Sequence, residues 1–305
     1  MKILFTLVLS LATTLAFGHG SDSKDTFMPE NNLHLQDNLK ISDMDEARFN
    51  EIIDSVYNVY KDVIDSHGKT LFMERNWNDS TVNAYASQSG DTWKVAMFGG
   101  LARRDEVTED GFALVVCHEL GHHLGGVAFY GNYDWASSEG QSDYFATQAC
   151  AKQIWRSDLE GNAAARESVD PVAKTACDIA WVSEADQNLC YRSAMGGASL
   201  AHLLSALGSQ DVPRFDTPDS DVVSRTNTRH PRGQCRMDTY FQGALCSAQF
   251  DIDLIPGKGH ESGQTSIEAE QVAADYSCTV ATGFAAGNRP SCWFAPLMGQ
   301  DEASH

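Results

Sequence analysis

The feature that most constrains this chain is the pentapeptide His-Glu-Leu-Gly-His at residues 118–122. On a helix, positions four residues apart lie on one face, so the imidazoles of His118 and His122 can reach one metal ion. Zinc favours nitrogen ligands, and Glu119 beside the first histidine can take a proton from a water molecule there. The apolar run at 112–116 indicates that the helix is buried. Two histidines and a glutamate are costly in a buried helix without partners, which favours a metal site over an ordinary core helix.

A catalytic zinc ion usually has three protein ligands and keeps one position open. Some zinc peptidases carry a third histidine six residues after the second, but Ala128 occupies that position here. Glu139 begins the next predicted helix, seventeen residues after His122, and is the expected third ligand, with Asp134 as the next candidate. Asp143 lies one turn beyond Glu139, where it can accept the remaining N–H of a ligating histidine. The alternative is that Glu139 is only an acid favoured by the N-terminal end of its helix. The expected cofactor is a single catalytic Zn²⁺ ion.

Hydrophobic periodicity predicts a mainly helical chain with a small sheet. Three strand-like runs precede the metal motif, and Ser89-Gly90-Asp91 is a hairpin signal between the second and the third. The expected strands are 71–77, 81–88 and 92–98, and the expected helices are 43–66, 109–124, 138–155, 171–187, 189–207, 231–246 and 266–279. Gly196-Gly197 predicts a helix break, and the polar stretch 208–229 predicts a long loop. The predicted fold class is α+β, predominantly helical, with a small β-sheet.

The first eighteen residues predict a secretory signal peptide, with Lys2 before an apolar run and a small-x-small site at 16–18. Residues 19–41 are polar and expected to be poorly ordered, which places the folded domain at 42–300. No later stretch is apolar enough to span a membrane. The net charge of −20 is expected to repel nucleic acid and anionic membranes. The predicted location is a periplasm or the outside of the cell.

Eight cysteines, an even number, predict disulfide bonds in an exported chain. None forms a Cys-x-x-Cys pair, which argues against a cysteine zinc site. A local bridge between Cys278 and Cys292 is expected, since a Gly- and Pro-containing loop separates them. Cys235 and Cys246 should not pair if one helix holds both, because eleven helical residues span about 16 Å. That exceeds the Cα limit of about 7 Å for a disulfide.

Separate elements of the sequence resemble one family when taken in order. They are Val82-Asn83-Ala84-Tyr85 on a strand, Phe98-Gly99-Gly100-Leu101 at the end of another, the His-Glu-Leu-Gly-His-His run, Glu139 with Asp143, and His230-Pro231 with Arg236. Between Thr81 and Cys246 the chain resembles the gluzincins, and more narrowly the family of HtpX-like heat-shock peptidases and CAAX prenyl endopeptidases. It departs from that family in lacking transmembrane helices and in its many cysteines, so membrane-protein or prenyl-protein substrates are not implied.

The resemblance implies an activity and roles for the matching residues. It implies zinc-dependent hydrolysis of peptide bonds, with zinc on His118, His122 and Glu139. It implies that His230 and Arg236 act near the oxyanion. It also implies that the strand with Asn83 and Ala84 holds the backbone of a peptide substrate, which would add as a strand along 81–88.

The residues around His230 support a donor role without the family. A tetrahedral intermediate needs fixed donors, and His230 lies at the end of a long loop and before a helix. Arg236 is expected to orient it or to neutralise charge, and Tyr240 and Tyr144 are weaker donor candidates. His123 is rotated by about 100° from His122 and is expected to be structural or exposed.

Other functions remain open from the sequence alone. The first is a zinc-binding periplasmic chaperone or binding protein without hydrolytic activity, against which the intact Glu119 argues. The second is a zinc hydrolase that acts on a non-peptide amide.

Overall fold

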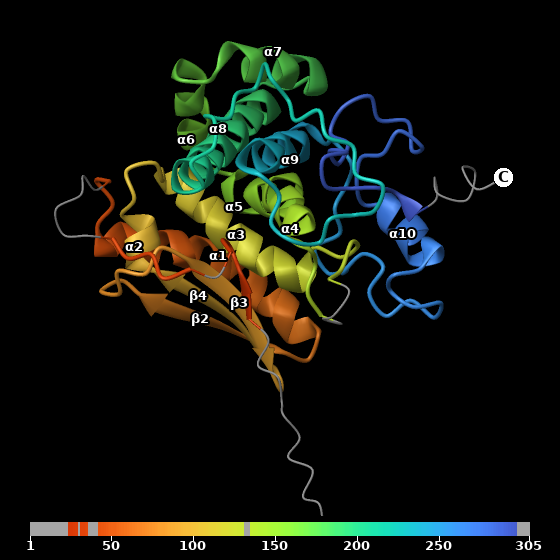
Figure 1. Ribbon diagram of the computed structural model, residues 1–305, viewed down its shortest axis with the longest axis horizontal. Coiled ribbons are helices and arrows are strands. Elements are labelled where there is room, and N and C mark those ends of the chain that lie inside the picture. Colours follow the sequence, from red (N-terminus) through yellow and green to blue (C-terminus); the bar gives the residue numbers. More distant parts are fainter. Residues whose placement is uncertain (1–23, 30, 36–41, 131–134, 298–305) are drawn as a thin grey trace, which may run out of the picture.

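Two long helices, α1 (Glu46–Ser66) and α3 (Glu109–Leu124), form the middle layer of the protein, between a small sheet and a group of other helices (Figure 1). The computed structural model describes residues 24–29, 31–35, 42–130 and 135–297. The main hydrophobic core lies between these layers, where Phe49 and Ile53 of α1 meet Phe112 of α3. The class predicted from the sequence, α+β with a small sheet, is confirmed.

The sheet has four strands in the order β1-β3-β4-β2. Strands β3 (Ala84–Ser89) and β4 (Thr92–Phe98) form the expected antiparallel hairpin, and β2 (Thr70–Asn76) pairs in parallel with β4. The turn includes Gly90 at φ 59°, a left-handed conformation that glycine adopts readily. All three predicted strands are confirmed.

The fourth strand, β1 (Lys24–Thr26), lies in the segment that the sequence predicts to be poorly ordered. It pairs antiparallel with β3, with Thr26 opposite Tyr85, and the next residue, Phe27, is completely buried. The predicted poor order of 19–41, and the domain boundary at 42, are therefore wrong for residues 24–29 and 31–35. The predicted signal peptide at 1–18 lies outside the described residues.

Helix α3 matches its predicted bounds and is buried on all sides. The Thr108 side chain accepts the Gly111 N–H as an N-cap, and every residue from 111 to 124 is buried. An apolar helix without a polar face needs cover all round. Here the sheet lies on one side of α3, and helices α4 (Glu139–Phe145) and α8 (Glu184–Leu207) pack against it elsewhere.

Helices α5 (Ala151–Trp155), α7 (Pro171–Ala180), α9 (Gly233–Leu245) and α10 (Ile267–Ala274) lie within predicted helices, and a π-helical turn at Ala146–Cys150 joins α4 to α5. The short helices α2 (Gly99–Ala102) and α6 (Leu159–Ala164) lie where the sequence predicts none. The break between the two helices predicted at 171–207 falls after Ala180, and the predicted break at Gly196-Gly197 is wrong because α8 runs through it. A Cβ on Gly197 would lie 2.4 Å from the Cβ of Tyr240, so this glycine allows α8 and α9 to approach closely. Residues 208–229 form no helix or strand, as predicted.

All eight cysteines form disulfides, in the pairs 117–150, 177–190, 235–292 and 246–278. Cys235 lies on α9 and Cys246 directly follows it, so the prediction that they do not pair with each other is confirmed. The predicted bridge between Cys278 and Cys292 is wrong. Each of these two cysteines instead joins a different end of α9 to the C-terminal segment.

No helix among the described residues has the length and apolar character that a membrane crossing requires.

The Cys117–Cys150 bridge joins α3 to the π turn that continues α4, and these two helices carry the predicted metal ligands. We expect the double substitution Cys117→Ala/Cys150→Ala to lower the free energy of unfolding by about 2–4 kcal/mol and also to weaken zinc binding. Urea unfolding and zinc titration measure the two effects. The matched control is Cys177→Ala/Cys190→Ala, which removes a bridge between α7 and α8 and should leave zinc affinity unchanged. Equal zinc affinity in the two double variants would contradict a role for the first bridge at the site.

Candidate metal centre

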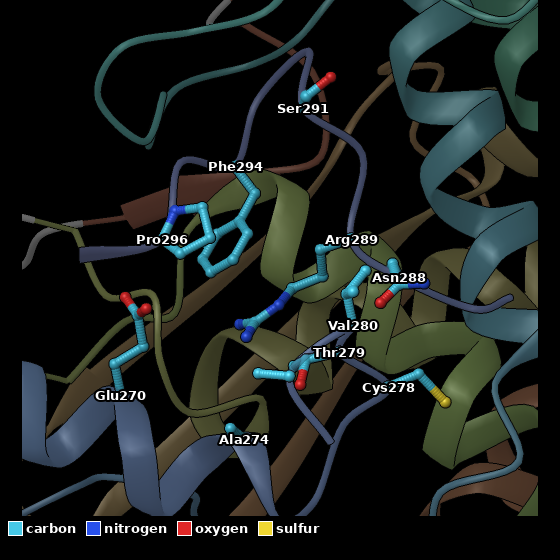
Figure 2. A pocket seen from close by; sticks show the side chains of 11 residues that line it. Glu270, Ala274, Cys278, Thr279, Val280, Asn288, Arg289, Ser291, Phe294 and Pro296 are labelled. Atoms are coloured by element: carbon cyan, nitrogen blue, oxygen red, sulfur yellow. The ribbon is translucent and has the colours of Figure 1, made fainter. Parts of the chain in front are cut away.

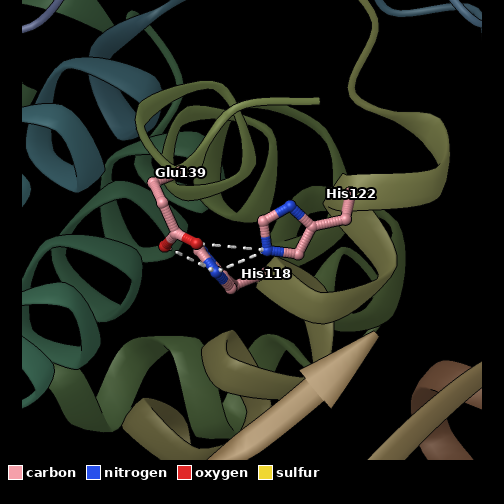
Figure 3. Close-up of side chains that lie close together, drawn as sticks. All are labelled: His118, His122 and Glu139. Carbon is pink, nitrogen blue, oxygen red and sulfur yellow. Dashed lines mark hydrogen bonds and ion pairs between the residues drawn. The ribbon is translucent and has the colours of Figure 1, made fainter. Parts of the chain in front are cut away.

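His118, His122 and Glu139 point toward one another in the interior of the protein (Figure 3). The two histidine Nε2 atoms are 3.1 Å apart, and the Glu139 carboxylate lies 3.4 Å from Nε2 of His118 and 3.7 Å from Nε2 of His122. Ligands bound tetrahedrally to zinc at 2.0–2.1 Å are about 3.3–3.4 Å from one another. All three side chains are fully buried. Their spacing therefore fits three ligands of one ion.

The hydrogen bonds of the two histidines fix their tautomers. Nδ1 of His118 lies 2.8 Å from Oδ1 of Asp143, and Nδ1 of His122 lies 2.8 Å from the carbonyl oxygen of Ser137. A carboxylate and a carbonyl can only accept, so each Nδ1 carries the hydrogen and each Nε2 presents a lone pair. Burial lowers the pKa of His118 to about 3, which keeps this ring neutral. Two lone pairs that face each other at this distance repel, so the donor set fits a bound cation.

Asp143 is held behind His118 by Arg236. The guanidinium donates from Nε to Oδ2 and from Nη2 to Oδ1, both at 2.7 Å. Burial alone would raise the pKa of Asp143, but Arg236 and His118 outweigh it and hold that pKa below its usual range. A charged carboxylate that accepts from a metal-ligating imidazole makes the ring a stronger ligand. The predicted partnership of Asp143 with a ligating histidine is therefore present.

A close approach of α3 and α4 brings the third ligand to the two histidines. A Cβ on Gly121 would lie 3.0 Å from the Cα of Ser142 and 3.1 Å from its carbonyl oxygen. The glycine inside the pentapeptide thus gives α4 the space to lie against α3. Ser138 caps α4, and Glu139 follows in its first turn.

His230 lies beside Glu139, at the end of the long loop. Its Nε2 atom is 3.2 Å from Oε1 of Glu139 and 2.7 Å from the carbonyl oxygen of Thr26. Burial lowers the pKa of His230 to about 4, so the ring is neutral near pH 7 and can donate from Nε2 to that carbonyl. The loop is anchored near this point, because Glu139 donates its backbone N–H to the Thr228 carbonyl. The structure therefore brings His230 to the predicted metal ligands.

The other predicted residues are placed as follows. Glu119 is fully buried on α3, directly after His118. Arg236 contacts Asp143 and also donates from Nη1 to the Phe27 carbonyl at 2.6 Å. Asn83 and Ala84 lie where β3 begins, next to β1.

The two tyrosine candidates are placed differently. The Tyr144 hydroxyl donates to the Gly287 carbonyl, away from the ligands. Tyr240 lies beside Asp143 and Arg236, and burial raises its pKa well above the ordinary value. His123 stacks between Trp93 and Trp135 and is fully buried, which confirms a structural position. Asp134, the alternative ligand, lies outside the described residues.

Three residues at the site were missed by the sequence analysis. The Tyr130 hydroxyl donates to Oε1 of Glu139 at 3.1 Å, and the Ser142 hydroxyl lies 3.0 Å from Nδ1 of His122. The Phe27 ring meets the His118 ring edge-on, with 5.3 Å between the centroids. Ser142 directly precedes Asp143 and could have been considered. Nothing in the local sequence marks Phe27 or Tyr130.

A separate pocket of about 530 Å³ lies near the C-terminal end of the described chain (Figure 2). Arg289 enters it and lies over the Phe294 ring, 3.8 Å from the centroid. None of the predicted site residues lines this pocket. It is therefore not part of the metal centre.

Comparison of the chain with protein-family models, with curated proteins and with solved structures finds no match. The metal centre is therefore judged on its own geometry, and the family resemblance stays a prediction.

We expect Asp143→Asn to weaken zinc binding about 10- to 100-fold. The amide cannot keep both the His118 N–H and the Arg236 pair, so the ligand loses its orientation and a buried guanidinium loses its charge partner. Zinc titration of the metal-free protein, with circular dichroism to check folding, measures the effect. Asp110→Asn is the matched control, because Asp110 also pairs with an arginine, Arg192, but outside the site. Equal zinc affinity in the two variants would remove Asp143 from the metal centre.

Proposed function

We propose that this protein is a zinc-dependent endopeptidase of the gluzincin type, a soluble exported relative of the HtpX-like and CAAX prenyl endopeptidases. The observation that carries the proposal is the convergence of two fixed histidine lone pairs and one carboxylate, with Glu119 next to the first histidine. Four disulfides support an oxidising compartment such as a periplasm or the outside of a cell.

In this proposal each residue has one task. His118, His122 and Glu139 hold zinc, which polarises a carbonyl and makes water a stronger nucleophile when bound. Glu119 accepts the proton of the attacking water and delivers it to the leaving amine. His230 donates a hydrogen bond to the oxygen of the scissile carbonyl as charge develops there.

Asp143 and Arg236 position this machinery. Asp143 holds the His118 ring, and Arg236 holds Asp143 through two charge-assisted hydrogen bonds, which are among the stronger kinds in proteins. We therefore assign Arg236 a positioning role through Asp143, in place of the direct role near the oxyanion that the resemblance implies.

We expect Glu119→Gln to abolish peptide hydrolysis while zinc stays bound, because the base is lost and the three ligands are kept. Metal analysis together with digestion of a denatured protein mixture measures both properties. Glu109→Gln is the matched control on the same helix, since Glu109 is exposed. Hydrolysis at the normal rate in zinc-loaded Glu119→Gln would refute the mechanism. A wild-type protein that binds zinc and cuts nothing would favour the non-hydrolytic binding protein instead.

We expect His230→Ala to lower kcat by about 10²–10³ with a smaller change in KM, because the lost donor acts mainly in the transition state. Steady-state kinetics on a fluorogenic peptide measure both constants. His202→Ala is the matched control, since the His202 ring also contacts a backbone carbonyl, that of Pro213, but away from the metal centre. An unchanged kcat in His230→Ala would make this histidine an ordinary loop residue.

A further inference from the structure

The segment that contains β1 and the two residues after it, Lys24–Met28, lies against the groups expected to hold a peptide substrate. Thr26 offers its carbonyl to Nε2 of His230 at 2.7 Å. Phe27 offers its carbonyl to Nη1 of Arg236 at 2.6 Å, and its N–H to the carbonyl of Ala84 at 3.1 Å.

Asn83 completes the set by binding both backbone polar groups of Met28. Its Oδ1 accepts the Met28 N–H at 3.1 Å, and its Nδ2 donates to the Met28 carbonyl at 3.3 Å. Five backbone groups in three consecutive residues are thus bound by the residues that the sequence analysis assigns to substrate binding or catalysis. Recognition of main chain along a strand edge is how proteins bind extended peptides of varied sequence.

The segment also lies close to the predicted metal ligands. The Thr26 carbonyl contacts the same Nε2 atom of His230 that lies 3.2 Å from Glu139. The Thr26 carbonyl therefore occupies the hydrogen-bond donor that the proposed mechanism assigns to the carbonyl of a substrate. The Phe27 ring is fully buried and packs edge-on against His118. The guanidinium carbon of Arg236 lies over this ring, 4.6 Å from the centroid of the ring.

The protein is not packed tightly around the whole segment. A pocket of about 310 Å³ lies beside it, and its lining includes Met28, Leu33, Leu207, His230 and Gly233. A longer peptide in the place of the segment would have room to extend here.

We infer that Lys24–Met28 occupies the substrate groove as an internal ligand, and that the groove accepts an extended peptide with a large apolar side chain in the place of Phe27. This inference rests on the proposed function. A peptide substrate and β1 compete for the same edge of β3, so substrate binds only when the segment has left. The apparent affinity for substrate is then reduced by the fraction of molecules in which the groove is open.

The test compares the full-length chain with Phe27→Ala. Truncation of a buried phenylalanine destabilises its packing strongly, so the groove should open and kcat/KM on a fluorogenic peptide should rise by about tenfold or more. Phe72→Ala is the matched control, because Phe72 is half exposed on β2, at the opposite edge of the sheet. Thr26→Gly, at a partly buried position, loosens the strand without a core cavity and should give a rise of about 2- to 5-fold.

A binding measurement separates this inference from the proposed function. The probe is a fluorescent hexapeptide with the sequence of residues 24–29, Lys-Asp-Thr-Phe-Met-Pro, and each protein carries Glu119→Gln so that the probe is not consumed. Anisotropy should show at least about tenfold tighter binding to Phe27→Ala than to the otherwise unchanged chain or to Phe72→Ala. The same hexapeptide with alanine for phenylalanine should bind more weakly.

The outcomes are distinct. Tighter probe binding without hydrolysis in any variant would support the internal ligand and reject the peptidase. Hydrolysis and probe binding that are unchanged in both Phe27→Ala and Thr26→Gly would overturn the internal ligand while leaving the peptidase intact.

Discussion

The rest of the structure depends on how the charge-bearing side chains of the metal centre are kept out of water. Unpartnered polar groups are costly in a protein interior, and charged groups are more costly still. Each imidazole therefore has a fixed acceptor at Nδ1, and the Asp143 carboxylate has a guanidinium on both of its oxygens. These partners come from α4, from the turn before it and from α9. The fold must bring two separate parts of the chain to α3, and the Cys117–Cys150 bridge and the approach at Gly121 hold the nearer of them in place.

The parts of the site that could be predicted are pairs of residues that lie one helical turn apart, because helix geometry fixes their relative positions. His118 and His122 share a face because they are one turn apart, and Asp143 follows Glu139 for the same reason. The long loop could be recognised from its composition, but its path could not, because the position of His230 depends on contacts such as Glu139 to Thr228. Disulfide pairing failed for the same physical reason. Cys278 and Cys292 are close in sequence, yet α9 places a different partner at each of its ends.

Two further errors show how tertiary contacts override local preference. The pair Gly196-Gly197 predicts a break when only the chain is considered, but Gly197 is needed so that α8 can pack against Tyr240. A polar stretch around residue 25 predicts poor order, since it contains too few apolar residues to form a core of its own. It is ordered because β3 offers an edge and because one residue, Phe27, is buried against His118 and Arg236.

The guanidinium of Arg236 makes the groove and the metal centre parts of one network. It binds the Asp143 carboxylate, which orients His118, and it binds the Phe27 carbonyl. A peptide in the groove therefore contacts a group that is two hydrogen bonds away from a metal ligand. If binding in the groove changes how Arg236 holds Asp143, thermodynamic linkage requires the metal to change the affinity of the groove by the same factor. The internal segment and the metal ion would then both act, through the Arg236 side chain, on the equilibrium between an occupied and an open groove. The segment itself supplies none of the three ligand atoms.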